Sequence, residues 1–182
     1  MVCDSNLKIT NIVAKWPGSA HDAWMLQQSS LYNNFETGKW KGLLLGDSAY
    51  PCKNWLMVQY RNPSREEQFR FNAALTRTRV MIEHCFGVWK RRFAILHGEI
   101  RMTPEKAAKV IGACAILHNI AVDRKIPVDH TETDYLENQP AQVEFEGKES
   151  GFVYRDQIAA NSFGKSMSNQ TGMQLTIFPL VR

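Results

Sequence analysis

The stretch TRTRVMIEHCFGVWKRRF, residues Thr76–Phe93, decides the fold because its apolar spacing is that of one long amphipathic helix. Apolar residues recur at every third or fourth position, so they share one stripe of a helix with 3.6 residues per turn. This stripe consists of Ile82, Cys85, Phe86, Trp89 and Phe93. Upstream, Ser64 and Glu67 have the spacing of a capping box, so we expect the helix to open there and to run to Phe93.

Glu83 is the only acidic residue in this stretch, and it lies beside the apolar stripe among basic side chains. A lone carboxylate at the edge of a buried face costs free energy unless a cation or a metal ion is its partner. Two interpretations stay open from this helix alone. Glu83 forms a surface ion pair with Arg79, four residues earlier, or it belongs to a metal-binding site.

A second motif lies upstream, where Leu43–Leu45 is followed by Gly46-Asp47-Ser48. A short apolar run that ends in such residues is typical of a buried strand that opens into a turn. Asp47 is therefore expected at the carboxyl end of a strand, the edge of an open α/β sheet where ligands bind. Together with Glu83 on a later basic helix, it matches the carboxylates of two-metal phosphoryl-transfer sites, whose ions lie about 3.5–4 Å apart.

Four motifs in this order resemble the DDE-type transposases of the PIF/Harbinger group. They are WPGSAHD at Trp16–Asp22, LLGDSAYP at Leu44–Pro51, TRVMIEHCFGVWKRRF at Thr78–Phe93 and ILHN at Ile116–Asn119. The resemblance implies an α/β fold, an RNase H-like mixed sheet flanked by helices, with a metal-binding acidic triad. Asp47 matches the second acid of that triad and Glu83 the third. The first acid of the family lies on a strand upstream of Met1, so we expect this chain to lack its first strand and most of its second.

The resemblance also implies an activity, a cofactor and partners. The activity is cleavage of DNA phosphodiester bonds with divalent metal ions, Mg²⁺ or else Mn²⁺, held by Asp47 and Glu83. The DNA backbone is expected to contact basic side chains of the predicted helix, namely Arg79, Lys90, Arg91 and Arg92. Because the first acid is absent, we expect the chain alone to be inactive. The alternative is a non-catalytic product that works through a partner, and the family is associated with a Myb-like protein.

Asp22 is a further candidate in the first motif, just before the apolar residues of a predicted short helix. It could cap that helix by accepting hydrogen bonds from backbone N–H groups. The family places an acidic residue here near its active site, so a role as an additional metal ligand stays open.

The charge of the chain is unevenly divided. Residues 1–128 hold 18 Lys and Arg against 10 Asp and Glu, whereas residues 129–182 hold 4 against 8. The basic part suits a polyanionic partner such as DNA. We predict three segments: a partial nuclease domain at 1–128, an acidic and poorly ordered linker at 129–150, and a short helix at Phe152–Phe163 within an unassigned tail at 151–182.

Targeting signals are not recognised in the sequence. No apolar run approaches the roughly 20 residues that cross a bilayer, and Asp4 and Lys8 interrupt the start too early for a signal peptide. The four scattered cysteines form no Cys-x-x-Cys pair. We therefore expect no membrane partner, no secretion, and a place in the nucleus, the cytoplasm or both.

The last long helix is predicted to begin with Thr103 as N-cap and Pro104 at its first position. Its expected buried face consists of Ala107, Val110, Ile111, Cys114, Leu117 and Ala121. His118 lies beside this face, so we interpret it as a structural rather than a catalytic histidine.

Overall fold

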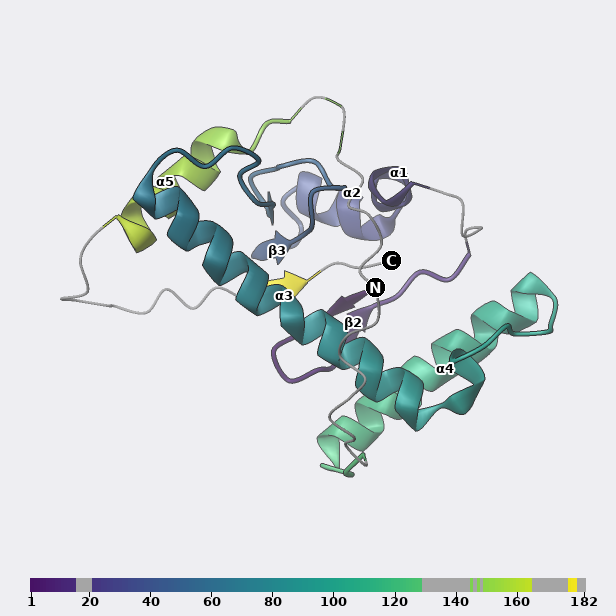
Figure 1. Ribbon diagram of the computed structural model, residues 1–182. Helices are drawn as coiled ribbons and strands as arrows, with labels where there is room; N and C mark the ends of the chain where they lie inside the picture. Colours follow the sequence, from purple (N-terminus) through teal and green to yellow (C-terminus); the bar gives the residue numbers. More distant parts are fainter. Residues whose placement is uncertain (16–20, 129–144, 146, 148, 165–176, 180–182) are drawn as a thin grey trace.

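The computed structural model describes residues 1–15, 21–128, 145, 147, 149–164 and 177–179 of the chain. Two small groups of strands lie among five α-helices in these residues (Figure 1). The strands are β1 (Val2–Cys3), β2 (Ile9–Asn11), β3 (Leu43–Leu45), β4 (Leu56–Met57) and β5 (Ile177–Pro179). The helices are α1 (Asp22–Gln27), α2 (Ser30–Glu36), α3 (Glu66–Arg92), α4 (Pro104–Asp123) and α5 (Phe152–Phe163), with a 3₁₀ turn at Ala94–Leu96. The predicted mixed α/β class is confirmed.

A three-stranded parallel sheet carries the predicted strand β3 at its centre. Its order is β4-β3-β5, with Leu44 opposite Leu56 on one side and Phe178 on the other. Side chains of β3 alternate between the two faces. Leu44 packs with α1 and α2, whereas Leu43 and Leu45 pack toward α3 and α5. All three are buried, so the uninterrupted apolar run follows from a strand that is covered on both faces.

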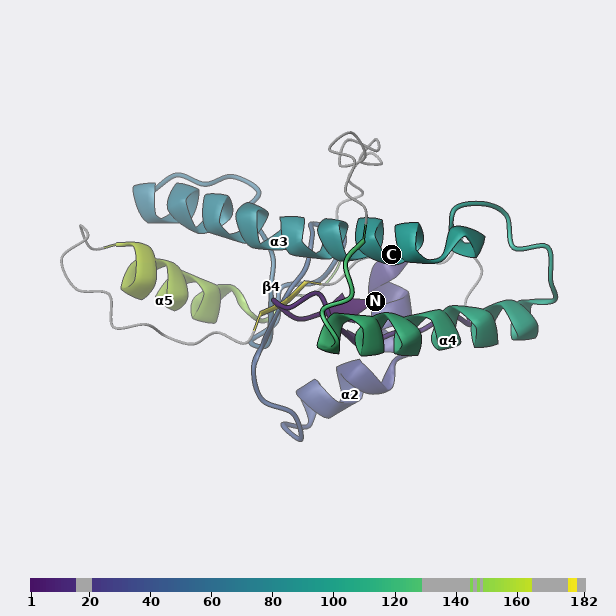
Figure 2. The same ribbon diagram turned by 90° about the horizontal axis from the view of Figure 1, so that it is seen from below.

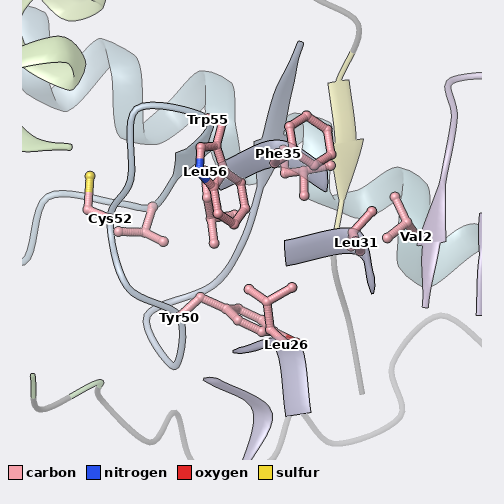
Figure 3. Close-up of a cluster of buried hydrophobic side chains, with 10 residues drawn as sticks. Val2, Leu26, Leu31, Phe35, Tyr50, Cys52, Trp55 and Leu56 are labelled. Carbon is pink, nitrogen blue, oxygen red and sulfur yellow. The ribbon is translucent and has the colours of Figure 1, made fainter. Parts of the chain in front are cut away.

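Helices cover the strands from two sides, with α3 and α2 on opposite sides (Figure 2). On the α1–α2 side, Leu26, Leu31 and Phe35 pack with Trp55 and Leu56 (Figure 3). On the other side, the first half of α3 packs with α5, which runs beside it (Figure 1). The core is therefore built on α3, the predicted long helix, whose observed bounds agree closely with the expectation.

The second half of α3 packs on the β1–β2 hairpin and α4. The shared cluster contains Cys3, Ile9, Ile82, Cys85, Trp89, Cys114 and Ala115. Within the hairpin, Asp4 Oδ1 accepts hydrogen bonds from the N–H groups of Asn6 and Lys8 at 2.8 and 3.0 Å, which fixes the turn between the two strands. The second strand of the hairpin, β2, ends at Asn11.

The ILHN motif holds this hairpin in place. Asn119 accepts a hydrogen bond from the N–H of Ile9 and donates one to its carbonyl, both at 2.8 Å. His118 is fully buried, and its Nε2 lies 2.8 Å from the carbonyl of Leu7. The interpretation of His118 as a structural residue therefore agrees with its contacts.

The prediction for the buried face of α4 is partly wrong. Leu117 is 53% exposed, and the buried residues are instead Cys114, Ala115, His118 and Ala121. The reason is that a polar residue occupies the core-facing position: His118 turns inward to reach the hairpin carbonyl, so Leu117 turns outward. The predicted start of α4 at Pro104, with Thr103 as N-cap, is confirmed.

The carboxyl-terminal helix α5 has the predicted bounds and shares the core of the sheet. Arg155 is buried, lies 3.8 Å above the centre of the Tyr60 ring, and donates hydrogen bonds to the carbonyls of Val58 and Gln59. The predicted poor order of 129–150 falls mainly on residues outside those described. Glu149, which is described, accepts a hydrogen bond from the N–H of Cys52 at 3.1 Å. The division into three segments stays a prediction.

The buried His118 generates a prediction about pH. Burial lowers the pKa of His118 from its ordinary value of 6.5, and the hydrogen bond to Leu7 offsets this only in part. Below pH 6.5 the unfolded chain therefore binds a proton that the folded protein excludes, so the free energy of unfolding falls as the pH falls. We expect a loss of up to about 1.4 kcal/mol per pH unit from this residue. Urea unfolding at pH 7.5 and 5.5 measures it.

The matched control for this prediction is His118→Gln, which keeps a side-chain donor for the Leu7 carbonyl and does not titrate. The variant is expected to lose less stability between pH 7.5 and 5.5 than the wild-type protein. If the wild-type protein and the variant lose equal free energies of unfolding, groups other than His118 cause the pH dependence.

Candidate active site

Asp47 lies where the sequence places it, just beyond the carboxyl end of β3. The preceding Gly46 allows the close packing of this turn, because a Cβ there would lie 3.0 Å from the Tyr50 ring and 3.2 Å from Leu56. Asp47 Oδ1 accepts a hydrogen bond from the N–H of Ala49 at 2.9 Å. This bond within the turn fixes the carboxylate at the edge of the sheet.

The other carboxylate oxygen of Asp47 faces α3. Its Oδ2 lies 3.8 Å from Nη2 of Arg79, and the two side chains are only 21% and 14% exposed. An ion pair that is partly buried is screened less by salt than one on the open surface. The pair therefore joins the end of the central strand to the middle of the long helix.

Glu83 follows Arg79 by four residues on α3 and is half-buried. Four residues correspond to about 6 Å along the axis and slightly more than one full turn, so both side chains leave the same side of the helix. The structure thus brings Asp47 to the part of α3 that carries Glu83, across 36 positions of sequence. The convergence of the two carboxylates on one point stays a prediction.

Asp22 is the first residue of α1 and not its cap. His21 occupies the N-cap position, and no side-chain capping bond forms, so the predicted capping role is wrong. The helix simply begins one residue earlier than expected, and an acid in its first turn still suits the helix dipole. The pKa of the Met1 amino group is lowered by burial, and the charge of Asp22 opposes that shift. Asp22 therefore lies near Met1, at the start of β1.

The basic residues expected to hold DNA differ in their contacts. Arg79 pairs with Asp47, and Arg92 donates a hydrogen bond to the carbonyl of Ile126 at 3.0 Å, just after α4. Lys90 and Arg91 are half-buried in the last turn of α3. The sequence did not predict the ion pair between Arg79 and Asp47, because the two residues lie on separate elements.

The donor set for a metal ion is incomplete in the described part of the chain. Asp47 and Glu83 supply the hard oxygen ligands that Mg²⁺ prefers. Within these residues, however, no group of three or more His, Cys, Asp or Glu side chains could hold a metal ion. Asp47 already has a cation beside it, the guanidinium of Arg79. By themselves the described residues therefore do not fit a two-metal site.

The four cysteines offer no alternative chemistry. Cys3, Cys52, Cys85 and Cys114 are all buried free thiols. Burial raises the pKa of the Cys52 thiol to about 11, so the thiol is protonated at neutral pH. Across the described ranges, no helix is long and apolar enough to cross a membrane.

The mixed α/β arrangement of the described residues is consistent with the family that comparison with known proteins identifies. Residues 1–119 match the family described as DDE superfamily endonuclease. The chain belongs to this family, which confirms the resemblance inferred from its motifs.

Curated relatives extend the match beyond that family region. The proteins named "Putative nuclease HARBI1" of Bos taurus and Homo sapiens are each 36% identical over 162 residues, 87% of this chain and 46% of their own length. The "Protein ALP1-like" of Arabidopsis thaliana is 25% identical over 189 residues, 92% of this chain and 46% of its own. The chain thus spans about half the length of these relatives. No solved structure matches.

The predicted convergence of Asp47 and Glu83 is testable by cross-linking. Because the native cysteines are all buried, the double variant Asp47→Cys/Glu83→Cys presents two new thiols to a short bifunctional maleimide. We expect an intramolecular cross-link, detected by mass spectrometry after digestion. The control pair is Asp47→Cys/Arg77→Cys, because Arg77 lies on the far side of α3 from Arg79. Equal yields from both pairs would contradict the site.

Proposed function

We propose that this domain contributes Asp47 and Glu83 to a metal-dependent DNA endonuclease of transposase origin, with an RNase H-like arrangement of its sheet. The observation that supports the proposal best is the ion pair between Asp47 and Arg79, which holds the strand-end carboxylate against the helix that carries Glu83. The family to which residues 1–119 belong consists of endonucleases, and such enzymes generally use divalent metal ions.

The DNA contact proposed for this domain lies on the last turn of α3. Lys90 and Arg91 follow Glu83 by about two helical turns, or about 10 Å along the axis. Contacts between cations and phosphates do not depend on base sequence, and they release counterions. The proposed place of action is the nucleus, the cytoplasm or both. Targeting of the protein to particular sites is then left to a partner, for which the resemblance suggests a Myb-like protein.

DNA binding through these cations makes a measurable prediction. Duplex DNA of arbitrary sequence should bind the protein, with an affinity that falls steeply as the salt concentration rises. The double variant Lys90→Gln/Arg91→Gln should bind more weakly, and the slope of log K against log salt should fall by about two, since each lost phosphate contact lowers it by about 0.9. Fluorescence anisotropy at several salt concentrations measures both.

The matched control is Lys39→Gln/Lys41→Gln, which removes the same charge from exposed positions between α2 and β3. If both double variants lower the slope equally, binding reflects overall charge, and α3 is not the contact surface.

A second prediction concerns cleavage by the 182-residue protein alone. We propose that it does not nick supercoiled plasmid DNA with Mg²⁺ or Mn²⁺, because the described residues bring together no three carboxylates as metal ligands and two are too few to fix a pair of ions. A gel assay for nicked circles tests this, with Asp47→Asn as the control. Metal-dependent nicking that Asp47→Asn abolishes would overturn the prediction and show a complete site.

The competing proposal is that the domain is non-catalytic and acts by binding a partner. The observation that favours this competing proposal is the ion pair between Asp47 and Arg79, because the guanidinium already balances the charge of the carboxylate. Absence of nicking together with salt-dependent DNA binding would fit either proposal for this polypeptide. An extended protein that includes further family segments distinguishes them, since only the first proposal expects metal-dependent nicking by it.

A further inference from the structure

Helix α4 carries an apolar stripe on the side that faces away from the core. Ile116, Leu117 and Ile120 are 64%, 53% and 42% exposed. With the exposed Ala113 they follow at spacings of three and four residues, so the four side chains share one face of the helix. Helix α3 and the β1–β2 hairpin pack against the other face (Figures 1 and 2). The stripe is therefore a continuous apolar surface along about two turns of α4.

The ILHN motif explains why this stripe lies on the surface. His118 and Asn119 face inward, where they bond to backbone groups of the hairpin. Ile116 lies two residues before His118, or about 200° around the helix, so the contacts that hold the hairpin direct Ile116 to solvent. Single exposed apolar residues are ordinary, whereas a contiguous group of them is typical of a binding surface. The outward half of the motif thus has no use in the core and suits a partner.

Exposed cations lie at both ends of the stripe. They are Lys106, Lys109, Arg124 and Lys125. Two acidic residues lie near the same ends. Glu105 occupies the first turn of α4, where it suits the helix dipole, and Asp123 pairs with Lys8 Nζ at 2.8 Å. The apolar surface is thus bordered by an excess of positive charge.

A second copy of this chain fits the stripe poorly. An antiparallel pair of α4 helices that sets Ile116 against Leu117 of the other copy also sets Lys109 against Arg124. A parallel pair sets Lys109 against the same residue of the other copy. Both arrangements bring like charges together beside an apolar contact, which is unfavourable. Nucleic acid suits the cations but not the apolar residues between them, because its backbone is charged throughout.

We propose that this face of α4 binds an amphipathic helix of another protein, one with acidic residues at both ends of its apolar stripe. Its apolar side chains would cover Ile116, Leu117 and Ile120, as in other complexes in which a helix binds through residues spaced three and four apart. Its carboxylates would meet Lys109 and Arg124, which lie about 22 Å apart along the axis, or about four turns. The inference goes beyond the proposed nuclease and uses neither Asp47 nor Glu83.

The test uses two fluorescein-labelled helical peptides of about 20 residues, long enough to reach both cations. Each peptide has leucines at positions i, i+3, i+4 and i+7 at its centre. One peptide has glutamates at both ends of this stripe, and the other has lysines in their place. Fluorescence anisotropy with the 182-residue protein should show that the acidic peptide binds about ten-fold or more tightly than the basic one, since two ion pairs replace two repulsions.

Two double variants test the two parts of the surface. Ile116→Ser/Leu117→Ser removes apolar contact area and should weaken binding of the acidic peptide about ten-fold or more. The matched control is Phe69→Ser/Val80→Ser, which changes two apolar residues of α3 that are 53% and 51% exposed and should leave the affinity unchanged. Lys109→Glu/Arg124→Glu should reverse the preference, so that the basic peptide binds more tightly.

Equal affinities of the wild-type protein for the two peptides would overturn the inference, as would a preference that Lys109→Glu/Arg124→Glu leaves unchanged. The charge reversal lies at exposed positions, so it tests the surface even where the serine variant does not fold.

Other occupants of the stripe give different results. A dimer in light scattering that Ile116→Ser/Leu117→Ser dissociates would assign the stripe to a second copy and overturn the inference. Binding to vesicles of phosphatidylserine and phosphatidylcholine that the same variant abolishes would assign the stripe to a lipid surface and overturn it likewise. These readouts involve no DNA, so failure of the proposed function as a nuclease leaves them interpretable.

Discussion

The packing of α3 along one side of the strands is the constraint on which the rest of the structure depends. Its first half covers Leu43, Leu45 and Met57 together with α5, and its second half covers the β1–β2 hairpin together with α4. The helix is long enough to do both because 27 residues extend about 40 Å. Two packing clusters that would each be small for a core are therefore joined on one rigid element.

The candidate site lies where these two clusters meet along α3. Leu75 belongs to the first cluster and Ile82 to the second, and Arg79 lies between them. A polar side chain is tolerated at this position because the end of β3 approaches there and supplies Asp47 as its partner. The site is thus a consequence of packing: the helix must cross the carboxyl end of the central strand to reach the hairpin.

Local patterns predicted the elements that bury an uninterrupted or periodic apolar face. The spacing of Ile82, Cys85 and Trp89 predicted α3, and the run Leu43–Leu45 predicted the central strand. Strand β4 has only two residues, too few for any periodicity, so the pattern of the sequence does not predict it. The buried face of α4 was predicted incorrectly because Ile116 and Leu117 are apolar yet exposed, while the polar His118 is buried. Hydrophobicity alone cannot predict a histidine that turns inward to reach a carbonyl.

The elements that carry Asp47 and Glu83 were predictable from the sequence, and the ion pair between Asp47 and Arg79 was not. Asp47 was predicted at the end of a strand, and Glu83 was predicted beside the apolar stripe of a helix. Both lie on the side of the sheet that α3 covers. Arg79 had two expected partners, Glu83 within the helix and a phosphate outside it, and the structure shows a third, Asp47. A carboxylate at a largely buried strand end costs free energy unless a cation lies beside it, and Arg79 supplies that cation.

Lys90 and Arg91 lie on the same helix as Arg79, so their distance along α3 relates the proposed DNA contact to the ion pair of Asp47 and Arg79. They lie seven and eight residues beyond Glu83, about 10–12 Å along the axis, and a nucleic acid strand advances about 3.4 Å per nucleotide. In the proposed complex, a backbone held at the end of α3 therefore presents a phosphate to Asp47 and Glu83 about three nucleotides away.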